Sequence, residues 1–376
     1  MPPDHLRVLL VGNYASDRQQ SMLRFGEMMK RGLLERTIDV TLLQPDARWL
    51  GQHNPGAGLG KWLGHGDKLV RFPAILRAAA RDHDVVHILD HSNAPYCRTI
   101  SDRPHLVTCH DLLAIRSAMG EFPENPTRWS GRRLQAMILR GIKQARMVAC
   151  VSRATQTDLA RVAGINGDRS RVVPNGLNHP YCPMPAPDVA ARLSAHGMPA
   201  SARYLLHVGG NHWYKHRSAA LRIVAALRRI AGHGDIHLVM VGEPLDHALR
   251  TLATTEGLTG HLHEFPGISN DDLNALYNGA LGLVFPSLYE GFGWPVIEAQ
   301  AAGCPVFIAE REPLPEIAGA FAIRFDLFKL VQAAAAIAEA LPRRAELVVG
   351  GSENAARYSA AAMIDGYLSL YRTLIP

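Results

Sequence analysis

The stretch of residues 283–308, LVFPSLYEGFGWPVIEAQAAGCPVFI, constrains the fold more than any other part of the sequence. It begins within an apolar run, residues 281–285, that has the length and the flanking residues of a buried strand. Pro295 suits the first position of a helix, and Gly303 and Pro305 are typical of the end of one. A strand joined to a helix through a short loop is the repeating unit of doubly wound α/β proteins, so this stretch predicts that class of fold.

The loop between this strand and this helix has the composition of an anion-binding site. Gly291 and Gly293 let the backbone turn tightly and approach a ligand closely, and the helix directs unpaired N–H groups and its positive dipole end into the loop. Two carboxylates frame the loop: we expect Glu290 at the strand end and Glu298 on the first turn of the helix, with seven residues between them. From the residues alone, Glu298 is either a ligand-binding group or a partner for the helix dipole, worth about 0.3–1 kcal/mol.

The segment EGFGWPVIEAQAAGCPV closely resembles the E-x7-E motif of the large retaining glycosyltransferase family 4. The resemblance implies the GT-B fold, in which two Rossmann-like doubly wound domains face each other across a cleft. It also implies that Glu290 lies by the donor sugar and that Glu298 binds the ribose hydroxyls of the nucleotide. Trp294 replaces an aliphatic residue of the family, and we assign it no functional role. The loop amides that hold the diphosphate would be those of Gly291, Phe292 and Gly293.

The pattern of an apolar run, a loop and a helix recurs in both halves of the chain. We expect an N-terminal acceptor-binding domain at residues 1–178 and a C-terminal nucleotide-sugar-binding domain at residues 201–357. Six prolines between Pro174 and Pro199 place the linker at residues 179–200. The last helix, residues 358–376, resembles the family segment that crosses back to brace the first domain. The strands expected from apolar runs are residues 6–11, 38–43, 85–89, 106–109, 147–151, 204–208, 236–241 and 281–285.

A second loop rich in glycine follows the strand that opens the second domain. Gly209 and Gly210 are followed by Lys215, and backbone amides beside an ammonium group suit a diphosphate. A lysine at the start of a helix is also an ordinary surface residue, which is the alternative. In the family, an arginine and a lysine of this loop grip the diphosphate, and Lys215 matches the lysine. Gly210 or Asn211 stands where the family has the arginine, so Arg217 is our candidate for the missing charge.

Four more positions are candidates through their place after a strand. Gly12 follows the first strand, at the end of a doubly wound sheet where ligands bind. His110 lies in TCHDL, which resembles the family strand that delivers a histidine to the hydroxyls of the donor sugar. From the residues alone, a structural histidine beside a helix-capping aspartate is the alternative for His110. Gly267 and Ile268 belong to residues 262–269, which resemble the family strand and turn whose backbone reads the nucleotide base.

The charge and the cysteines limit the partners and the compartment. A net charge of +6 and a pI of about 9.2 imply attraction to an anion, and nucleic acid, an acidic membrane and phosphorylated substrates all qualify. Nucleic acid is disfavoured because the basic residues are not interleaved with stacking aromatic residues. The five cysteines are scattered without zinc or redox spacing. With neither a signal peptide nor an apolar run of spanning length in the sequence, we expect a cytoplasmic protein, with the inner face of the plasma membrane as an alternative location.

Three segments resemble functional motifs only in part. The helix expected at residues 128–146 carries six basic residues among apolar ones. It suits either an anionic membrane surface or a solvated charged face on a domain core, which we favour. Residues 51–66 are rich in glycine, but they follow no strand and lack Ser or Thr after the lysine, so we interpret them as a mobile loop. Asp82, His83 and Asp84 precede a strand, which suits a solvent-facing loop, and we predict no metal site.

The predicted activity is transfer of a hexose, with retention of its anomeric configuration, from a nucleoside diphosphate sugar. GDP-mannose is our first guess for the donor and UDP-glucose the second, and the acceptor would be a glycan or a lipid-linked glycan in cell-surface polysaccharide synthesis. We expect no cofactor, because Lys215, Arg217 and loop amides would stabilise the leaving diphosphate. Glu290, His110 and Lys215 would form the catalytic group, with no covalent adduct on Glu290. The alternatives are a nucleotide-sugar epimerase or phosphorylase of the same fold, and a non-enzymatic sugar-nucleotide-binding scaffold.

Overall fold

The computed structural model describes residues 6–17, 19–51, 53, 58–199 and 201–375. The chain divides into two compact units, which we describe separately. Unit 1 consists of residues 1–178 and 360–376, and unit 2 consists of residues 179–359.

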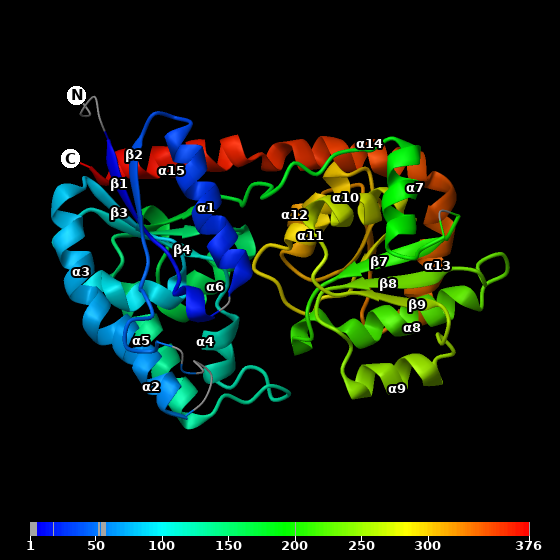
Figure 1. The fold of residues 1–376 in the computed structure, drawn as a ribbon, viewed down its shortest axis with the longest axis horizontal. Coiled ribbons are helices and arrows are strands. Elements are labelled where there is room, and N and C mark those ends of the chain that lie inside the picture. Colours follow the sequence, from blue (N-terminus) through cyan, green and yellow to red (C-terminus); the bar gives the residue numbers. More distant parts are fainter. Residues whose placement is uncertain (1–5, 18, 52, 54–57, 200, 376) are drawn as a thin grey trace. The chain divides into compact units, whose positions relative to one another are not determined.

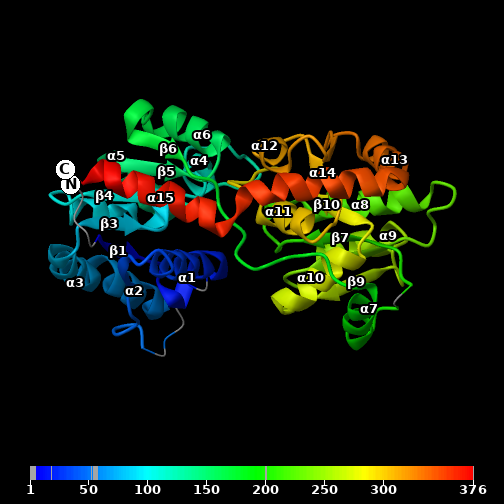
Figure 2. The same ribbon diagram turned by 90° about the horizontal axis from the view of Figure 1, so that it is seen from above.

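The segment expected as a linker, residues 179–200, contains a helix and clusters with unit 2. This helix, α7 (Ala186–Ala195), lies beside α10 (Asn270–Gly279), as Figure 2 shows. Its Val189 and Leu193 side chains are buried. The prolines therefore mark the start of a helix rather than an extended connection, because Pro187 lies in its first turn, where no N–H donor is needed.

Unit 1 is built on one six-stranded parallel sheet with the order β2-β1-β3-β4-β5-β6. This order confirms the doubly wound class, because the chain leaves β1 in one direction and returns past it to β3 on the other side. The inner strands β3, β4 and β5 are buried along their whole length, which is why they appear in the sequence as continuous apolar runs. The strands are β1 (Arg7–Val11), β2 (Asp39–Leu43), β3 (Val85–Ile88), β4 (His105–Cys109), β5 (Met147–Cys150) and β6 (Ser170–Val172).

The helical elements of unit 1 include seven α-helices, one π-helix and one 3-10 helix. They are α1 (Gln20–Leu34), α2 (Gly58–Gly66), the π-helix η2 (Asp67–Arg71), α3 (Phe72–Ala79), the 3-10 helix η4 (His91–Arg98), α4 (Leu113–Ala118), α5 (Trp129–Gln144), α6 (Arg153–Ala163) and α15 (Ala360–Leu374).

The prediction of a mobile loop at residues 51–66 is wrong from residue 58 onward, where α2 and η2 form one continuous helical segment. Residues 52 and 54–57 of that prediction lie outside the described residues. The glycines of this segment are poor helix formers, and tertiary contacts override them. The buried Asp67 carboxylate accepts hydrogen bonds from the backbone N–H groups of Trp49 (2.9 Å) and Leu50 (3.0 Å) and from the hydroxyl of Tyr14 (3.2 Å).

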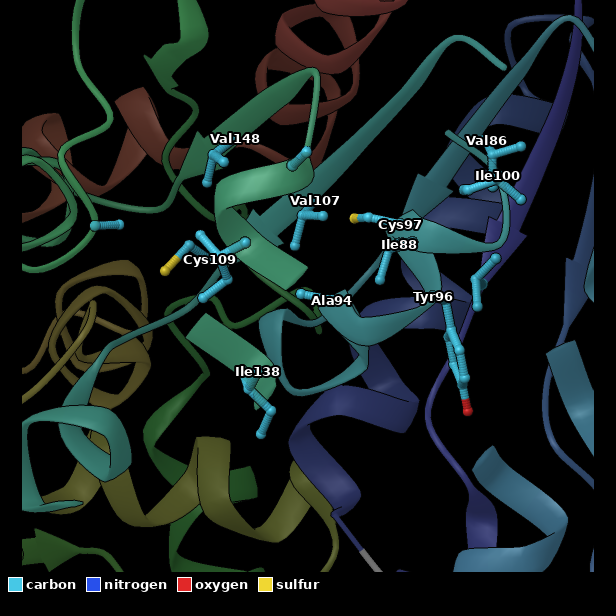
Figure 3. Packing of buried hydrophobic residues seen from close by; sticks show 14 of the residues in the cluster. Val86, Ile88, Ala94, Tyr96, Cys97, Ile100, Val107, Cys109, Ile138 and Val148 are labelled. Carbon is cyan, nitrogen blue, oxygen red and sulfur yellow. The ribbon is translucent and has the colours of Figure 1, made fainter. Parts of the chain in front are cut away.

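A cluster of buried side chains in unit 1 joins the sheet to the helices α3, η4, α5 and α6. Val107 on β4 pairs in register with Ile88 on β3 and Val148 on β5, and Figure 3 shows these side chains beside Ala94 and Ile138. Gly141 on α5 permits the close packing of that helix on η4, because a Cβ on Gly141 would lie 2.4 Å from the Ala94 carbonyl oxygen.

The last helix, α15, packs against α1 and completes unit 1 (Figure 1). Its tyrosines reach the sheet: the Tyr371 hydroxyl lies 2.7 Å from Nδ1 of His87, and the Tyr367 hydroxyl lies 2.9 Å from the hydroxyl of Thr108. The other ring nitrogen of His87 lies 2.7 Å from that same Thr108 hydroxyl. Burial lowers the pKa of His87 to about 3, so the ring is neutral near pH 7.

Unit 2 repeats the architecture with a second six-stranded parallel sheet, in the order β12-β11-β10-β7-β8-β9. The chain leaves β7 through β8 and β9 and then returns to β10 on the other side of β7. The strands are β7 (Tyr204–Val208), β8 (His237–Val241), β9 (Leu262–Phe265), β10 (Gly282–Phe285), β11 (Val306–Ala309) and β12 (Ile323–Phe325). The remaining α-helices of this unit are α8 (Arg217–Arg228), α9 (His247–Thr255), α11 (Trp294–Ala301), α12 (Leu314–Ala318), α13 (Leu330–Ala340) and α14 (Arg344–Ala355).

Candidate functional site

The carboxyl ends of β7 and β10 form the topological switch point of unit 2, the place where ligands bind in sheets of this kind. The two strands are hydrogen-bonded neighbours, and the buried His207 ring joins them further through Nδ1, which donates to the Val284 carbonyl (3.0 Å). The loops that follow also meet, because the Leu288 N–H donates to the Tyr214 carbonyl (2.8 Å). Two predicted loops, one after each strand, are thereby brought together.

Lys215 and Glu290 form an ion pair between these two loops. Lys215 Nζ lies 2.7 Å from Glu290 Oε1, with side-chain exposures of 16% and 9%. The ammonium group also lies 5.2 Å from the centre of the Phe285 ring, within the range of a cation–π contact. A cation and a carboxylate, both largely buried, thus lie together at the edge of the sheet where a ligand is expected.

The loop before α11 turns into the helix through Gly293. Gly293 has φ +100°, a conformation that a residue with a side chain rarely adopts, and a Cβ there would lie 3.0 Å from the Leu314 side chain. Pro295 lies in the first turn of α11, where its missing N–H is tolerated. Phe292 is buried and contacts the ring of Trp294 edge-on, at 6.3 Å between centres. The predicted glycine-loop and helix geometry is therefore present.

The predicted place of Glu298 on the first turn of α11 is wrong. The helix begins at Trp294, one residue before the proline, so Glu298 is its fifth residue and lies on the second turn. A helix dipole acts most strongly on the first turn, so the interpretation of Glu298 as a dipole partner loses its basis. The side chain is only 5% exposed, and its Oε2 accepts a hydrogen bond from the Tyr277 hydroxyl (3.0 Å).

Tyr277 is a site residue that the sequence does not reveal, because it lies on α10, well away from the motif. It is fully buried, and burial together with the neighbouring Glu298 carboxylate raises the pKa of Tyr277 well above its usual value. The phenol therefore stays protonated and donates to the carboxylate. This contact holds the buried Glu298 carboxylate in one orientation, as preorganisation of a binding site requires.

The loop after β7 is shaped by contacts with the loop after β8. The Gly209 N–H donates to the Val241 carbonyl (2.9 Å), and the Asn211 N–H donates to a carboxylate oxygen of Glu243 (2.9 Å). Gly242 has φ +131°, and a Cβ on it would lie 2.4 Å from the Gly209 carbonyl oxygen. Gly210 is close to Glu243 as well, because a Cβ there would lie 3.2 Å from the same carboxylate oxygen. The contact between Asn211 and Glu243 was not expected from the sequence.

Arg217, the candidate for the missing diphosphate arginine, is only 3% exposed at the start of α8. Its guanidinium group donates to the Glu243 carbonyl (2.8 Å) and to the Asn211 side-chain oxygen. Burial lowers the pKa of Arg217, although the guanidinium stays charged. The structure therefore places Arg217 in contact with a side chain of the loop after β7 and with the backbone of the loop after β8. A direct contact with a diphosphate stays a prediction.

The two residues expected to read the nucleotide base lie apart from the β7–β10 switch point, after the outer strand β9. Gly267 is exposed and has φ +68°, and Ile268 is half-buried just before α10. The adjacent Ser269 caps that helix, because its hydroxyl accepts the Asp272 N–H (3.1 Å). The predicted turn is present, and its role in base binding stays a prediction.

The two remaining candidates, His110 and Gly12, belong to unit 1. Nε2 of His110 donates to the Leu89 carbonyl (2.9 Å), and the ring lies edge-on to Phe25 at 4.8 Å. Burial lowers the pKa of His110, with the Asp90 carboxylate opposing that shift. Gly12 follows β1, where its N–H donates to the Leu43 carbonyl (2.9 Å). The structure places both at the carboxyl ends of strands, as expected.

Two features of the described part of the chain bear on the other predictions. Within residues 6–17, 19–51, 53, 58–199 and 201–375, no group of three or more His, Cys, Asp or Glu side chains is arranged to hold a metal ion. Asp84 of the rejected motif instead binds Arg7, with 3.1 Å between a guanidinium nitrogen and a carboxylate oxygen. Over the same residues, no helix has both the length and the apolar character needed to cross a membrane.

Comparisons with known proteins match both halves of the chain. The family model "Glycosyl transferases group 1" matches residues 194–341, and the model "Glycosyltransferase Family 4" matches residues 26–180. A D-inositol 3-phosphate glycosyltransferase of Acidothermus cellulolyticus is 30% identical over 329 residues, which are 80% of this chain and 70% of that protein.

Two further proteins are similar to this chain, one in sequence and one in structure. An MMP alpha-(1->4)-mannosyltransferase of Mycolicibacterium hassiacum is 30% identical over 192 residues, 51% of this chain and 43% of that protein, so this chain spans under half of its length. The solved structure of the Anabaena protein HepE in complex with UDP and glucose superposes with a TM-score of 0.73 at 16% identity, covering 98% of this chain and 100% of that one. This structural likeness confirms the predicted fold, two six-stranded parallel sheets with their helices.

Proposed function

Because this chain belongs to family 4 of the glycosyltransferases and has the GT-B fold, we propose that it transfers a hexose from a nucleoside diphosphate sugar to a glycan or lipid-linked glycan. Mannose is the first candidate sugar, supported by the relative that is a mannosyltransferase. Glucose is the second, supported by the fold relative whose structure contains UDP and glucose. We place the reaction in cell-surface polysaccharide synthesis.

The observation that carries the proposal is the Lys215–Glu290 ion pair at the switch point of unit 2. In the free protein the two charges neutralise each other. When a sugar diphosphate binds, its phosphate oxygens are the stronger partners for Lys215, and Glu290 is released toward the sugar. The amides of residues 291–293, at the start of α11, add fixed positive dipoles beside the leaving diphosphate.

In this proposal the bond between the anomeric carbon and the diphosphate oxygen breaks, and the acceptor hydroxyl oxygen bonds to that carbon on the same face. The proton of the acceptor hydroxyl passes to the leaving phosphate oxygen. Glu290 polarises and positions the sugar through hydrogen bonds without covalent attachment, and His110 contacts sugar hydroxyls. Lys215 and the loop amides supply the positive charge that a bound metal would otherwise supply, so the activity should persist in a chelator.

Glu298 would bind the ribose hydroxyls of the donor. A carboxylate has about four lone-pair sites, so accepting the Tyr277 hydroxyl is compatible with accepting ribose hydroxyls as well. Because such hydrogen bonds to a charged acceptor contribute roughly 1.5–3 kcal/mol, Glu298→Ala should lower nucleotide affinity by one to two orders of magnitude.

The experiment is a calorimetric titration of metal-free protein with GDP, UDP and ADP, repeated with Glu298→Ala. The matched control is Glu339→Ala, an exposed acid on α13 of the same unit. Selective binding of one nucleotide, lost in Glu298→Ala and kept in the control, supports the donor site. Absence of binding to all three nucleotides would contradict the proposed function.

For location, the proposal is the cytoplasm, with peripheral contact at an anionic membrane. Its support is the net charge of +6 and the exposed face of α5. On that face Trp129 is 67% exposed, and the Arg133 guanidinium lies 4.2 Å from the centre of its ring. The opposite face of α5, including Ile138 and Ile142, is buried in the core. Sedimentation with anionic and with zwitterionic vesicles tests this contact, and equal binding to both would contradict it.

A further inference from the structure

Unit 1 contains a cavity of about 200 Å³ at its own topological switch point. Because β1 and β3 are neighbours in the sheet, the loops that follow them meet, and ligands bind at such places in sheets of this kind. Asn13 follows β1 and Asn93 lies beyond β3, and both line the cavity. Residues of η2 and of α5 also line the cavity. The cavity is smaller than pockets for drug-sized ligands, which hold about 300–1,000 Å³, and suits a single ring.

The floor of the cavity is a network of amides and carboxylates. Asn13 is only 3% exposed, and its amide nitrogen donates to both Asp90 and Gln19. Its side-chain oxygen accepts a hydrogen bond from Asn93 (3.1 Å). Gln135 projects from α5 into the lining with no hydrogen bond of its side-chain amide to any described residue. Amides, which donate and accept hydrogen bonds, and carboxylates, which accept them, are together suited to the adjacent hydroxyls of a sugar ring.

The charges that line the cavity cancel. Its lining contains one lysine and one aspartate, and Lys68 Nζ lies 2.8 Å from the carboxylate of Asp17. No arginine and no second lysine belongs to the lining among the described residues. Recognition of a phosphate group usually relies on a cluster of cations or on a bidentate arginine. The cavity therefore fits an uncharged ring better than a phosphorylated one.

One side of the cavity is apolar and continues onto the surface. Leu69 on η2 lines the cavity opposite Met137 on α5, and Leu69 is 39% exposed. His65, also in the lining, contacts the ring of Trp62 one turn earlier on α2, with 6.4 Å between ring centres. Trp62 is 74% exposed. Two exposed apolar side chains therefore belong to the cavity or adjoin it: Leu69, which lines it, and Trp62, which contacts the lining residue His65. We call these two side chains the apolar path.

The buried carboxylate of Asp67 anchors the start of η2, the helical segment that carries Lys68 and Leu69. By binding the amides of residues 49 and 50 and the Tyr14 hydroxyl, it fixes the first residue of η2 next to the floor of the cavity. Lys68 and Leu69 follow directly, so both the charged pair and the apolar rim start from an anchored position. A binding site with this support is preorganised, which lowers the entropy lost on binding.

We propose that this cavity of unit 1 holds the acceptor and that the acceptor is an uncharged sugar ring bearing an apolar substituent, which leaves the cavity over Leu69 toward Trp62. The inference rests on the proposed glycosyl transfer and adds to it the chemical class of the acceptor. It separates this chain from an enzyme that acts on a phosphorylated polyol, because the cavity supplies hydroxyl partners and an apolar exit but no surplus positive charge.

The experiment compares three probes by calorimetry: n-octyl glucoside, methyl glucoside and glucose 6-phosphate, with the octyl glycoside kept below the concentration at which micelles form. The corresponding mannose compounds are measured in parallel. We expect the octyl glycoside of one sugar to bind at least tenfold more tightly than its methyl glycoside, and the sugar phosphate to bind more weakly than either. Nucleotide binding is measured on the same protein, so that a failure of the donor site is seen separately from a failure of the acceptor site.

Two variants assign the two parts of the ligand. Leu69→Asp should remove the advantage of the octyl chain and leave binding of the methyl glycoside unchanged. Its control is Met119→Asp, which places a charge at an exposed position of unit 1 outside the cavity. Gln135→Ala should weaken both glycosides about equally, and its control is Arg140→Ala, an exposed residue of the same helix.

Three results would overturn the inference. Equal binding of octyl and methyl glycosides would show that the site does not recognise an apolar substituent. Tighter binding of the sugar phosphate would show that the acceptor is charged. Failure of every glycoside to bind a protein that binds a nucleotide would remove the cavity as the acceptor site while leaving the proposed transferase intact.

Discussion

The hydrogen bond from Tyr277 to Glu298 gives a prediction whose size follows from the geometry. Tyr277→Phe removes one hydroxyl and keeps the ring, so no cavity opens in the core. The lost bond is 3.0 Å long, lies between two buried side chains and has a charged acceptor, and such bonds contribute roughly 1.5–3 kcal/mol. We expect the free energy of local opening around α10 and α11 to fall by that amount, which raises amide exchange rates roughly 10- to 150-fold.

The assay is native-state hydrogen exchange followed by mass spectrometry, because the two units can unfold separately and a single unfolding transition would then mix them. The matched control is Tyr358→Phe. That hydroxyl belongs to a residue that is also buried, but it donates over 3.3 Å to a neutral carbonyl, that of Glu316, so its loss should cost about 1 kcal/mol or less. If Tyr277→Phe opens its surroundings no more than the control opens α12, the tyrosine does not hold the Glu298 carboxylate as we describe.

Three further predictions concern Lys215 in the loop after β7, Gly242 in the loop after β8 and the attachment of α15 to unit 1. Lys215→Met should lower the transfer rate at saturating donor by roughly 100-fold or more, as expected for loss of a charge that stabilises the leaving group, and a rate within threefold of wild type would exclude that role. Gly242→Ala should weaken nucleotide binding by displacing the Gly209 carbonyl. Gly257 also has a positive φ (+73°) but open space around it, so Gly257→Ala should change only stability, by about 1 kcal/mol; nucleotide titration of both variants decides. The pKa of His87 is about 3 in the folded protein and about 6.5 when unfolded. Its contribution to stability is therefore complete above pH 6.5 and declines as the pH falls toward 3, by roughly 1.4 kcal/mol per pH unit. Denaturation of wild type and His87→Phe across this range should show a weaker pH dependence of stability in the variant.

Most inner strands could be predicted because burial on two faces leaves a direct record in the sequence. The run at residues 281–285 is an example: β10 occupies residues 282–285, and every residue of it is buried. The edge strands β6 and β12 and the inner strand β11 were not among the expected strands. The helix at residues 58–66 could not be predicted in the same way. Its glycines argue against a helix, and what overrides them is the Asp67 carboxylate binding amides of residues 49 and 50, a contact that no local pattern encodes.

In the candidate site too, local sequence features could be predicted, whereas contacts between distant segments could not. The glycine loop, Lys215 and Glu290 could be located from motif and spacing, because each follows directly from the end of a strand. The side-chain environment could not: Arg217 was expected to face a diphosphate and is buried in contact with the loops after β7 and β8, and Tyr277 was not expected at all. The turn of α11 that carries Glu298 was misplaced because the helix begins one residue before the proline that marks it in the sequence. These features depend on packing between elements that lie far apart in the chain.

The attachment of α15 to unit 1 has a consequence for the order in which the protein folds during its synthesis. The sheet of unit 1 leaves the ribosome early, but the tyrosines that pair with His87 and Thr108 are near the end of the chain. All of residues 179–359 must be made in between, which takes on the order of 10–40 s at about 5–20 residues per second. During that interval the imidazole of His87 and the hydroxyl of Thr108 can pair with each other but lack their tyrosine partners. By the end of the interval all strands of unit 2 have been made. We therefore expect the second unit to reach its final structure before the first, the reverse of the order of synthesis.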